Sequence, residues 1–192
     1  MMKSYLLGID IGTSACKVAV FDRNGKVLAA ANGDYPVYYP HEGWAEQNPE
    51  EWWDAVCRAT KETIQKADIS PDEIAGVGID GQSWSAIAID KEGKVLTNTP
   101  IWMDTRAQSI CDRLNQEIGA DKIFKVAGNS LQPSYSTAKI LWYRENLPEV
   151  YAKIDKILQS NSYIAYKLTD AVTQDVSQGY GLHCFDMRKG CW

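Results

Sequence analysis

Two apolar runs joined by a short polar turn, within residues 6–21, constrain the fold of this chain more than any other stretch. The run at residues 6–9 is typical of a buried strand, and a second apolar run follows at residues 18–21. A tight turn of glycine, threonine and serine between two such runs predicts a β-hairpin. Antiparallel strands at the start exclude a dinucleotide-binding opening, in which a strand leads through a glycine turn into a helix.

The hairpin carries the residue types of a metal and phosphate site. Gly12 lets the backbone approach an anion closely, while Thr13, Ser14 and Lys17 add two hydroxyls and a positive charge. A carboxylate beside a phosphate needs a cation between them, and Mg²⁺ is commonly held by one or two carboxylates together with substrate phosphates. We therefore expect Asp10 to be the catalytic carboxylate and the metal ligand. The alternative is an ordinary hairpin with a solvated aspartate.

Composition narrows the class of protein. The 192 residues are enough for one domain with a sizeable core, and the 45% of hydrophobic residues fit a globular chain. A net charge of −5 argues against a nucleic-acid partner. No apolar stretch reaches the roughly 18 residues of a membrane span. The five scattered cysteines, without a CxxC pair, indicate reduced thiols in a cytoplasmic protein rather than a zinc site.

Hydrophobic periodicity predicts an α/β chain, and local signals mark its helix ends. Asn48 is expected to cap a helix that ends near Ala67, with Glu51 completing a capping box. Asp104 is expected to cap a helix from Thr105 that Gly119 stops. Strands are expected at residues 5–11, 16–22, 27–31, 74–79 (buried), 84–90, 95–97 and 156–159. Further helices are expected at residues 121–126, 136–146, 148–154 and 163–168.

Six ordered motifs resemble the N-terminal domain of the FGGY carbohydrate kinases and run over nearly the whole chain. They are GIDIGTSACKVAVFDRNGKV, the PEEWW helix start, GIDGQSW, PIWMDTRA, YSTAKILWYREN, and SYIAYKLTD followed by TQDVS. The resemblance implies an α/β fold of the actin–hexokinase (ribonuclease H-like) type, with a mixed five-stranded sheet and flanking helices. It also implies ATP- and Mg²⁺-dependent phosphorylation of a sugar. The xylulokinase group is most similar, although it usually has Met-His where this chain has Ser83-Trp84.

The resemblance also assigns site residues. The hairpin would face ATP and Mg²⁺, and the segments after residues 81 and 101 would line the sugar. For Trp102 and Arg106 a structural role, in holding Asp104, is the alternative. The ATP and metal residues would be Asp10, Gly12, Thr13, Ser14 and Lys17. The sugar residues would be Gln82, Ser83, Trp84, Trp102, Asp104, Arg106 and Tyr135.

Members of this family have a second domain that forms the adenine pocket and closes over the cleft. Their general base is an aspartate in a GxGD-like segment, and residues 1–192 contain none. We therefore expect this chain to be an N-terminal domain cut short before its end, inactive by itself. We also expect it to self-associate, most simply as a homodimer, through the surface that would meet the missing half. The alternatives are a non-catalytic sugar- or nucleotide-binding module of the same fold, and an α/β domain without activity.

Overall fold

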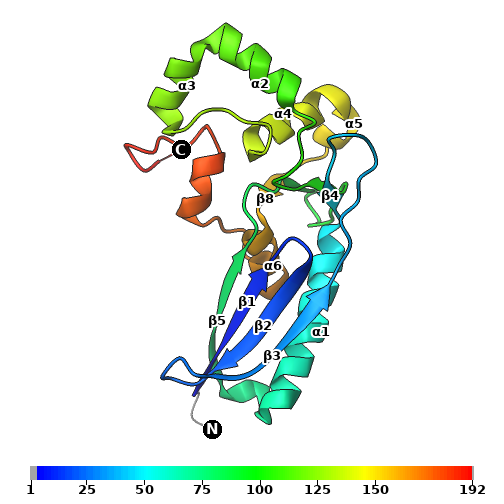
Figure 1. Ribbon diagram of the computed structural model, residues 1–192, viewed down its shortest axis with the longest axis vertical. Helices are drawn as coiled ribbons and strands as arrows, with labels where there is room; N and C mark the ends of the chain where they lie inside the picture. Colours follow the sequence, from blue (N-terminus) through cyan, green and yellow to red (C-terminus); the bar gives the residue numbers. More distant parts are fainter. Residues whose placement is uncertain (1–3, 192) are drawn as a thin grey trace.

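The computed structural model describes residues 4–191 and is built on one mixed sheet. The strand order is β3-β2-β1-β5; β1 runs antiparallel to β2 and parallel to β5, as Figure 1 shows. The antiparallel hairpin predicted from the first motif is therefore confirmed. The four strands are β1 (Tyr5–Ile11), β2 (Ala15–Phe21), β3 (Val27–Asp34) and β5 (Ile74–Gly81).

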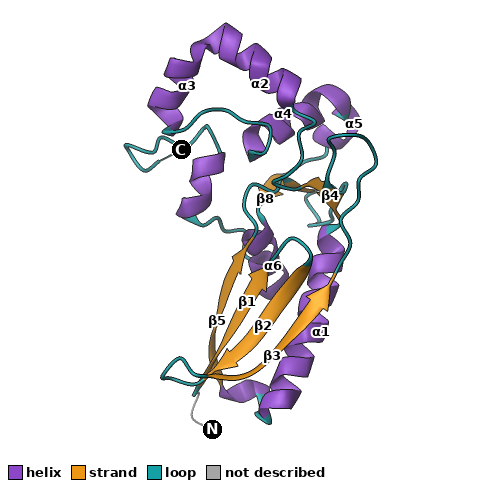
Figure 2. Ribbon diagram, in the orientation of Figure 1, coloured by secondary structure: helices purple, strands orange, loops and turns teal. Residues whose placement is uncertain are grey.

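Alternation along the hairpin decides which face of the sheet is covered. Leu7, Ile9 and Ile11 of β1 point to the same buried face as Val18 and Val20 of β2. Helix α1 (Pro49–Ala67) packs on β2 and β3, and α6 (Ser160–Thr169) packs on β5 and β1. Figure 2 shows α1 lying along the sheet. These contacts bury one side of the hairpin and leave the other side for a surface groove.

The long helix α1 begins and ends where the sequence predicts. The side chain of Asn48 accepts a hydrogen bond from the N–H of Glu50 (3.0 Å), and Asp68 ends the helix in a left-handed conformation. The carboxylate of Glu51, expected to complete a capping box, instead accepts the hydroxyl of Tyr38 (2.7 Å). Trp52 is fully buried, so its role is packing.

The rest of the chain forms short strand pairs and a group of helices beyond the strand ends (Figure 1). Two small sheets pair β4 (Glu46–Gln47) with β7 (Thr99–Pro100), and β6 (Ile87–Ile89) with β8 (Lys156–Leu158). The remaining helices are α2 (Gln108–Leu114), α3 (Ala120–Ala127), α4 (Ser136–Asn146) and α5 (Pro148–Tyr151), with a π-helical turn at Asn115–Gly119 and 3₁₀ turns at Pro71–Glu73 and Val176–Gly181. None of the helices within residues 4–191 has the length and apolar character needed to cross a bilayer.

Three expectations about these elements need correction. The main sheet has four strands rather than five, because only Ile87–Ile89 of the expected strand at residues 84–90 forms, and it pairs with β8. Strand β5 is an edge strand and is largely exposed, with Val77 at 47%. Asp104 does not cap a helix, because α2 starts at Gln108. Gly119 does end the helical run, as predicted, because it closes the π-helical turn with a φ of 92° and α3 starts at the next residue.

Candidate active site

A pocket of about 410 Å³ opens where β1 and β5 end. Because these two strands are parallel, their carboxyl ends lie at the same edge of the sheet, where sites on α/β sheets form. The two segments that the sequence assigns to phosphate and to sugar therefore meet in one place. The lining residues are Asp10, Ile11, Gly12, Thr13, Gly81, Gln82, Ser83, Trp84 and Trp102.

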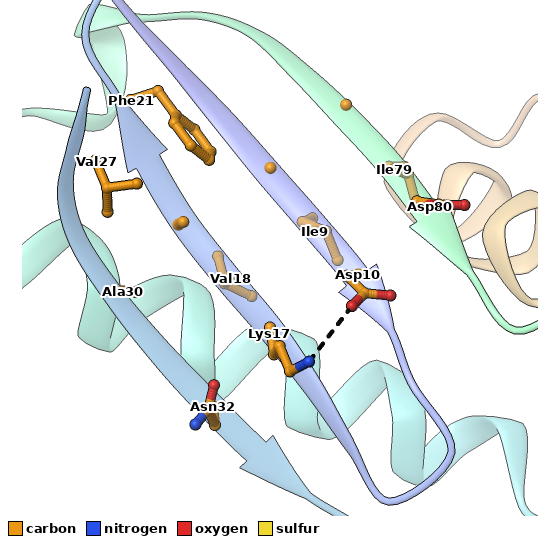
Figure 3. Close-up of a pocket in the computed structure, with 13 residues that line it drawn as sticks. Ile9, Asp10, Lys17, Val18, Phe21, Val27, Ala30, Asn32, Ile79 and Asp80 are labelled. Atoms are coloured by element: carbon orange, nitrogen blue, oxygen red, sulfur yellow. Dashed lines mark ion pairs between the residues drawn. The ribbon is translucent and has the colours of Figure 1, made fainter. Parts of the chain in front are cut away.

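A second hollow, of about 620 Å³, lies on the face of the sheet that the helices leave open (Figure 3). The registers set a polar row across its four strands, in the order Asp80, Asp10, Lys17, Asn32. Lys17 Nζ lies 3.9 Å from the carboxylate of Asp10, and both side chains are at least half exposed. Asp10 lines both hollows, so it stands at the junction between the pocket and the sheet face.

The turn after β1 is tight and its shape requires glycine. A Cβ on Gly12 would lie 2.9 Å from the carbonyl oxygen of Ala15, which already accepts the N–H of Gly12 (3.1 Å). The hydroxyl of Tyr35 donates to the carbonyl of Gly12 (2.7 Å). Within residues 4–191 the N–H groups of Thr13 and Ser14 make no hydrogen bond, so the turn offers two donors to an anion.

A buried amide bridge fixes this turn to the other wall of the pocket. Gln47 is fully buried, and its Nε2 donates to the carbonyl of Thr13 (2.8 Å) while its Oε1 accepts Nε2 of Gln82 (2.8 Å). Gln82 Nε2 also lies 3.3 Å from the carbonyl of Gly12. The amide nitrogen of Gln82, expected to face the sugar, is thus committed to the turn.

Two tryptophans form the aromatic walls of the pocket. Trp102 is 43% exposed, and its indole N–H donates to the hydroxyl of Thr13 (3.0 Å). Trp84 has a left-handed backbone (φ 64°), and its ring stands edge-on to Tyr135 with centroids 4.7 Å apart. The hydroxyls of Tyr135 and Tyr180 are 3.3 Å apart, and burial, followed by this contact, raises the pKa of Tyr135 to about 12. Tyr135 therefore supports Trp84 from behind and does not line the pocket.

Asp104 and Arg106 lie behind the pocket and not in it. Asp104 is fully buried; its carboxylate accepts the N–H of Ala45 (2.7 Å) and the guanidinium of Arg106 (2.8 Å). Arg106 also pairs with Glu46 (2.9 Å) and lies 3.8 Å from the centre of the Trp44 ring. Arg106 thus holds Asp104, which is the structural role considered for it as the alternative from the sequence, and neither side chain is among those that line the pocket.

The chain is similar in sequence and in fold to known carbohydrate kinases. The family model described as the FGGY family of carbohydrate kinases, N-terminal domain, matches residues 5–192. The chain belongs to the FGGY family of carbohydrate kinases. It is 32% identical to a xylulose kinase of Escherichia coli over 97% of this chain. It is 30% identical to a glycerol kinase of Thermococcus gammatolerans over 100% of this chain. A solved xyloylose kinase from Brucella ovis superposes over 98% of this chain with a TM-score of 0.91 at 30% identity.

The match covers only part of these relatives. The chain spans 38% of the E. coli xylulose kinase, 39% of the T. gammatolerans glycerol kinase and 38% of the B. ovis structure. The resemblance to the FGGY kinases and the actin–hexokinase type of fold, both expected from the motifs, are confirmed. Two different substrates occur among relatives of nearly equal identity, so the FGGY fold is shared by kinases that act on a ketose and on a polyol.

The donor set at the strand ends fits the Mg²⁺ and ATP that FGGY kinases use. Within residues 4–191 no three His, Cys, Asp or Glu side chains gather to hold a metal by themselves. Asp10 is a hard oxygen ligand at the rim of the pocket, and Mg²⁺ needs only one or two such ligands when phosphates supply the rest. Asp10 would hold the ion, and Thr13, Ser14 and Lys17 would contact the phosphates, whose charge the ion would neutralise.

Sequence reasoning missed two residues around the pocket. Gln47 and Lys139 are fully buried polar groups that bind backbone carbonyls next to the pocket. Gln47 precedes the cap of α1, and Lys139 occupies an inward position of α4 among apolar residues. A lysine on the apolar face of a predicted helix was the one available signal.

Proposed function

We propose that this chain is the sugar- and phosphate-binding domain of an ATP-dependent kinase whose substrate is a ketose such as xylulose. The position of Asp10 carries the proposal, because it joins the strand-end pocket to the open face of the sheet. The carboxylate of Asp10 lies beside the turn assigned to the phosphates and at the rim of the pocket assigned to the acceptor sugar. In phosphoryl transfer the protein acts chiefly by such positioning and by charge neutralisation.

The pocket supplies what a polyhydroxyl ligand needs. Trp84 and Trp102 offer two aromatic surfaces for the carbon skeleton, and the hydroxyl of Ser83 is a polar partner within the same wall. Gln178 Nε2 lies 3.3 Å from that hydroxyl, which fixes its place. The sugar site of this proposal therefore comprises Ser83, Trp84 and Trp102, with Gln82 holding the turn.

A non-catalytic sugar- or nucleotide-binding module is the second candidate. It would share the hairpin but would not need Asp10 for turnover. Trp84 and Trp102 line the same pocket as the turn whose Thr13 and Ser14 N–H groups make no hydrogen bond within residues 4–191. This arrangement favours a site that brings sugar and phosphate together. We also propose that the complete protein has a second domain supplying the adenine pocket and the general base. On that basis we expect that residues 1–192 alone release no ADP from ATP in the presence of xylulose.

The experiment is Asp10→Asn in the complete kinase, with Asp80→Asn as the matched control. Both carboxylates are exposed on adjacent strands in the same row, but Asp80 does not line the strand-end pocket. Asp10→Asn should reduce kcat at least about 100-fold while xylulose still binds, since losing a charge contact at such a site costs about 3 kcal/mol or more of transition-state stabilisation. Asp80→Asn should retain most activity. A near-normal kcat for Asp10→Asn would refute the assignment.

A substrate panel separates the candidates. ADP release by the complete protein with xylulose, glycerol and gluconate, in a coupled assay, reports which acceptor gives the highest kcat/KM. Saturable release with xylulose supports the ketose kinase. Binding of xylulose without release under any nucleotide condition supports the non-catalytic module.

A further inference from the structure

One face of α4 binds the backbone that leads into the pocket wall. Ser136, Lys139 and Tyr143 are three and four residues apart, so they lie on one side of the helix. Their side chains donate to three successive carbonyls: Lys139 Nζ to Trp84 (2.8 Å), Ser136 Oγ to Ser85 (3.0 Å) and Tyr143 Oη to Ala86 (3.0 Å). These carbonyls would otherwise be unpaired inside the protein, because the strand starts only at Ile87.

Lys139 is the one of these three residues for which the structure gives a hydrogen bond to a second backbone carbonyl. Its Nζ also donates to the carbonyl of Ile101 (2.8 Å), whose peptide bond leads directly to Trp102. The side chain of Lys139 is fully buried. One amino group therefore links the backbones of both tryptophan walls, which come from different segments of the chain.

The backbone at Trp84 requires such a restraint. A φ of 64° is left-handed, and a bulky residue adopts it only where the surroundings hold it there. The ring of Trp84 packs against Tyr135 and against Gly181, where a Cβ would come within 2.2 Å. The hydrogen bond from Lys139 Nζ to the carbonyl of Trp84 restrains the backbone of the same residue.

We propose that Lys139 is a positioning residue of the pocket, which sets the separation of the Trp84 and Trp102 walls without touching the ligand. That the ligand is a ketose rests on the proposed function; the tie between the walls does not. Removing the amino group of Lys139, which donates to both walls, should allow both walls to move. Removing a donor elsewhere on the same face of α4 should not.

The test is ¹⁹F NMR of the complete protein labelled with 5-fluorotryptophan, with signals assigned from single Trp→Phe variants. Lys139→Met has nearly the same length and no donor. We expect it to shift or broaden the signals of both Trp84 and Trp102 and to leave that of Trp52, which is fully buried and makes no hydrogen bond with Lys139, unchanged. The matched control is Tyr143→Phe, which removes one buried hydrogen bond from the same helix face and should leave the Trp102 signal in place.

Titration with xylulose separates this inference from the proposed function. In the wild type, xylulose should move the Trp84 and Trp102 signals in a saturable way, and Lys139→Met should weaken this binding at least 10-fold. If xylulose moves neither signal in the wild type, the ketose assignment fails, and the wall signals of the free variants still decide the role of Lys139.

Two results would overturn the proposal. The first is a folded Lys139→Met whose Trp84 and Trp102 signals match the wild type. The second is a Tyr143→Phe variant that moves both signals as far as Lys139→Met does. Should Lys139→Met fail to fold, Lys139→Gln, whose shorter amide cannot reach both carbonyls, replaces it under the same criteria. If neither folds while Tyr143→Phe does, Lys139 serves the whole domain and a role specific to the walls is refuted.

Discussion

The indole N–H of Trp102 donates a hydrogen bond of 3.0 Å to the hydroxyl of Thr13, which lies 89 positions earlier in the chain. Thr13 belongs to the turn assigned to phosphate, and Trp102 belongs to the wall assigned to sugar. Together with the Gln47 bridge, this bond makes the two halves of the pocket one unit. A ligand that moves one wall therefore acts on the phosphate turn as well.

Trp102→Phe and Thr13→Val should each remove this hydrogen bond and lower the stability of the protein. In a double-mutant cycle we expect a coupling of about 0.5–1.5 kcal/mol in the free energy of unfolding, the usual net value of one hydrogen bond. Urea unfolding of the wild type, the two single variants and the double variant measures it. Effects of the two substitutions that simply add would show that the bond contributes nothing to stability.

Asp104→Asn should destabilise the fold instead of altering sugar choice. The change leaves Arg106 without its fully buried partner, and breaking a buried ion pair costs about 3–5 kcal/mol of the free energy of unfolding. Urea unfolding measures this loss. Glu62→Gln, at the exposed pair with Lys66, is the control and should change stability by less than about 0.5 kcal/mol. An equally stable Asp104→Asn variant with weaker xylulose binding would return Asp104 to the sugar site.

Gly181→Ala should displace the Trp84 wall. The added methyl group would lie 2.2 Å from Cδ1 of the Trp84 ring, so the ring must move, at a cost of about 1–3 kcal/mol from overpacking. We expect lower stability and weaker xylulose binding, measured by urea unfolding and calorimetry. The control is Gly76→Ala, whose Cβ meets only a side-chain atom of Leu6 at an ordinary 3.7 Å. Unchanged xylulose binding by Gly181→Ala would show that this wall does not contact the sugar.

Stability should rise with pH above about 7 because of Lys139. Burial lowers the pKa of Lys139 to about 7 from 10.5, the nearby carboxylate of Asp104 opposing the shift and Arg106 adding to it. Between these values the unfolded chain holds a proton that the folded chain has released, so the free energy of unfolding increases with pH. The slope from one group is at most about 1.4 kcal/mol per pH unit.

Urea unfolding of the wild type and of Lys139→Met at pH 7, 8 and 9 measures this effect. Taking the difference between the two proteins removes the contributions of other groups, including Cys16, Cys57 and Cys111, whose thiol pKa values burial raises. The wild type should gain stability relative to the variant as pH rises. A constant difference would mean that Lys139 titrates at its ordinary pKa.

Features that depend on near neighbours along the chain could be predicted before the fold was known. The apolar runs and the tight turn of the hairpin fix β1 and β2, and Asn48 and Pro49 fix the start of α1, because strand alternation and helix capping act over a few residues. The bounds of α4 were also predicted in full, because its apolar residues recur at helical spacing and Pro148 follows its end. The ordered motifs also identified the FGGY family.

The contacts of the polar side chains, by contrast, depend on residues that only the folded chain brings together. Asp104 and Arg106 have the residue types of a sugar site, but distant partners, Ala45 and Glu46, bury them behind it. The strand expected from Trp84 onward starts late because carbonyls of its first residues bind α4, and that choice depends on Lys139, more than 50 residues away. Burial of a polar group is stable only with such partners, and no local pattern reveals which distant residue provides them.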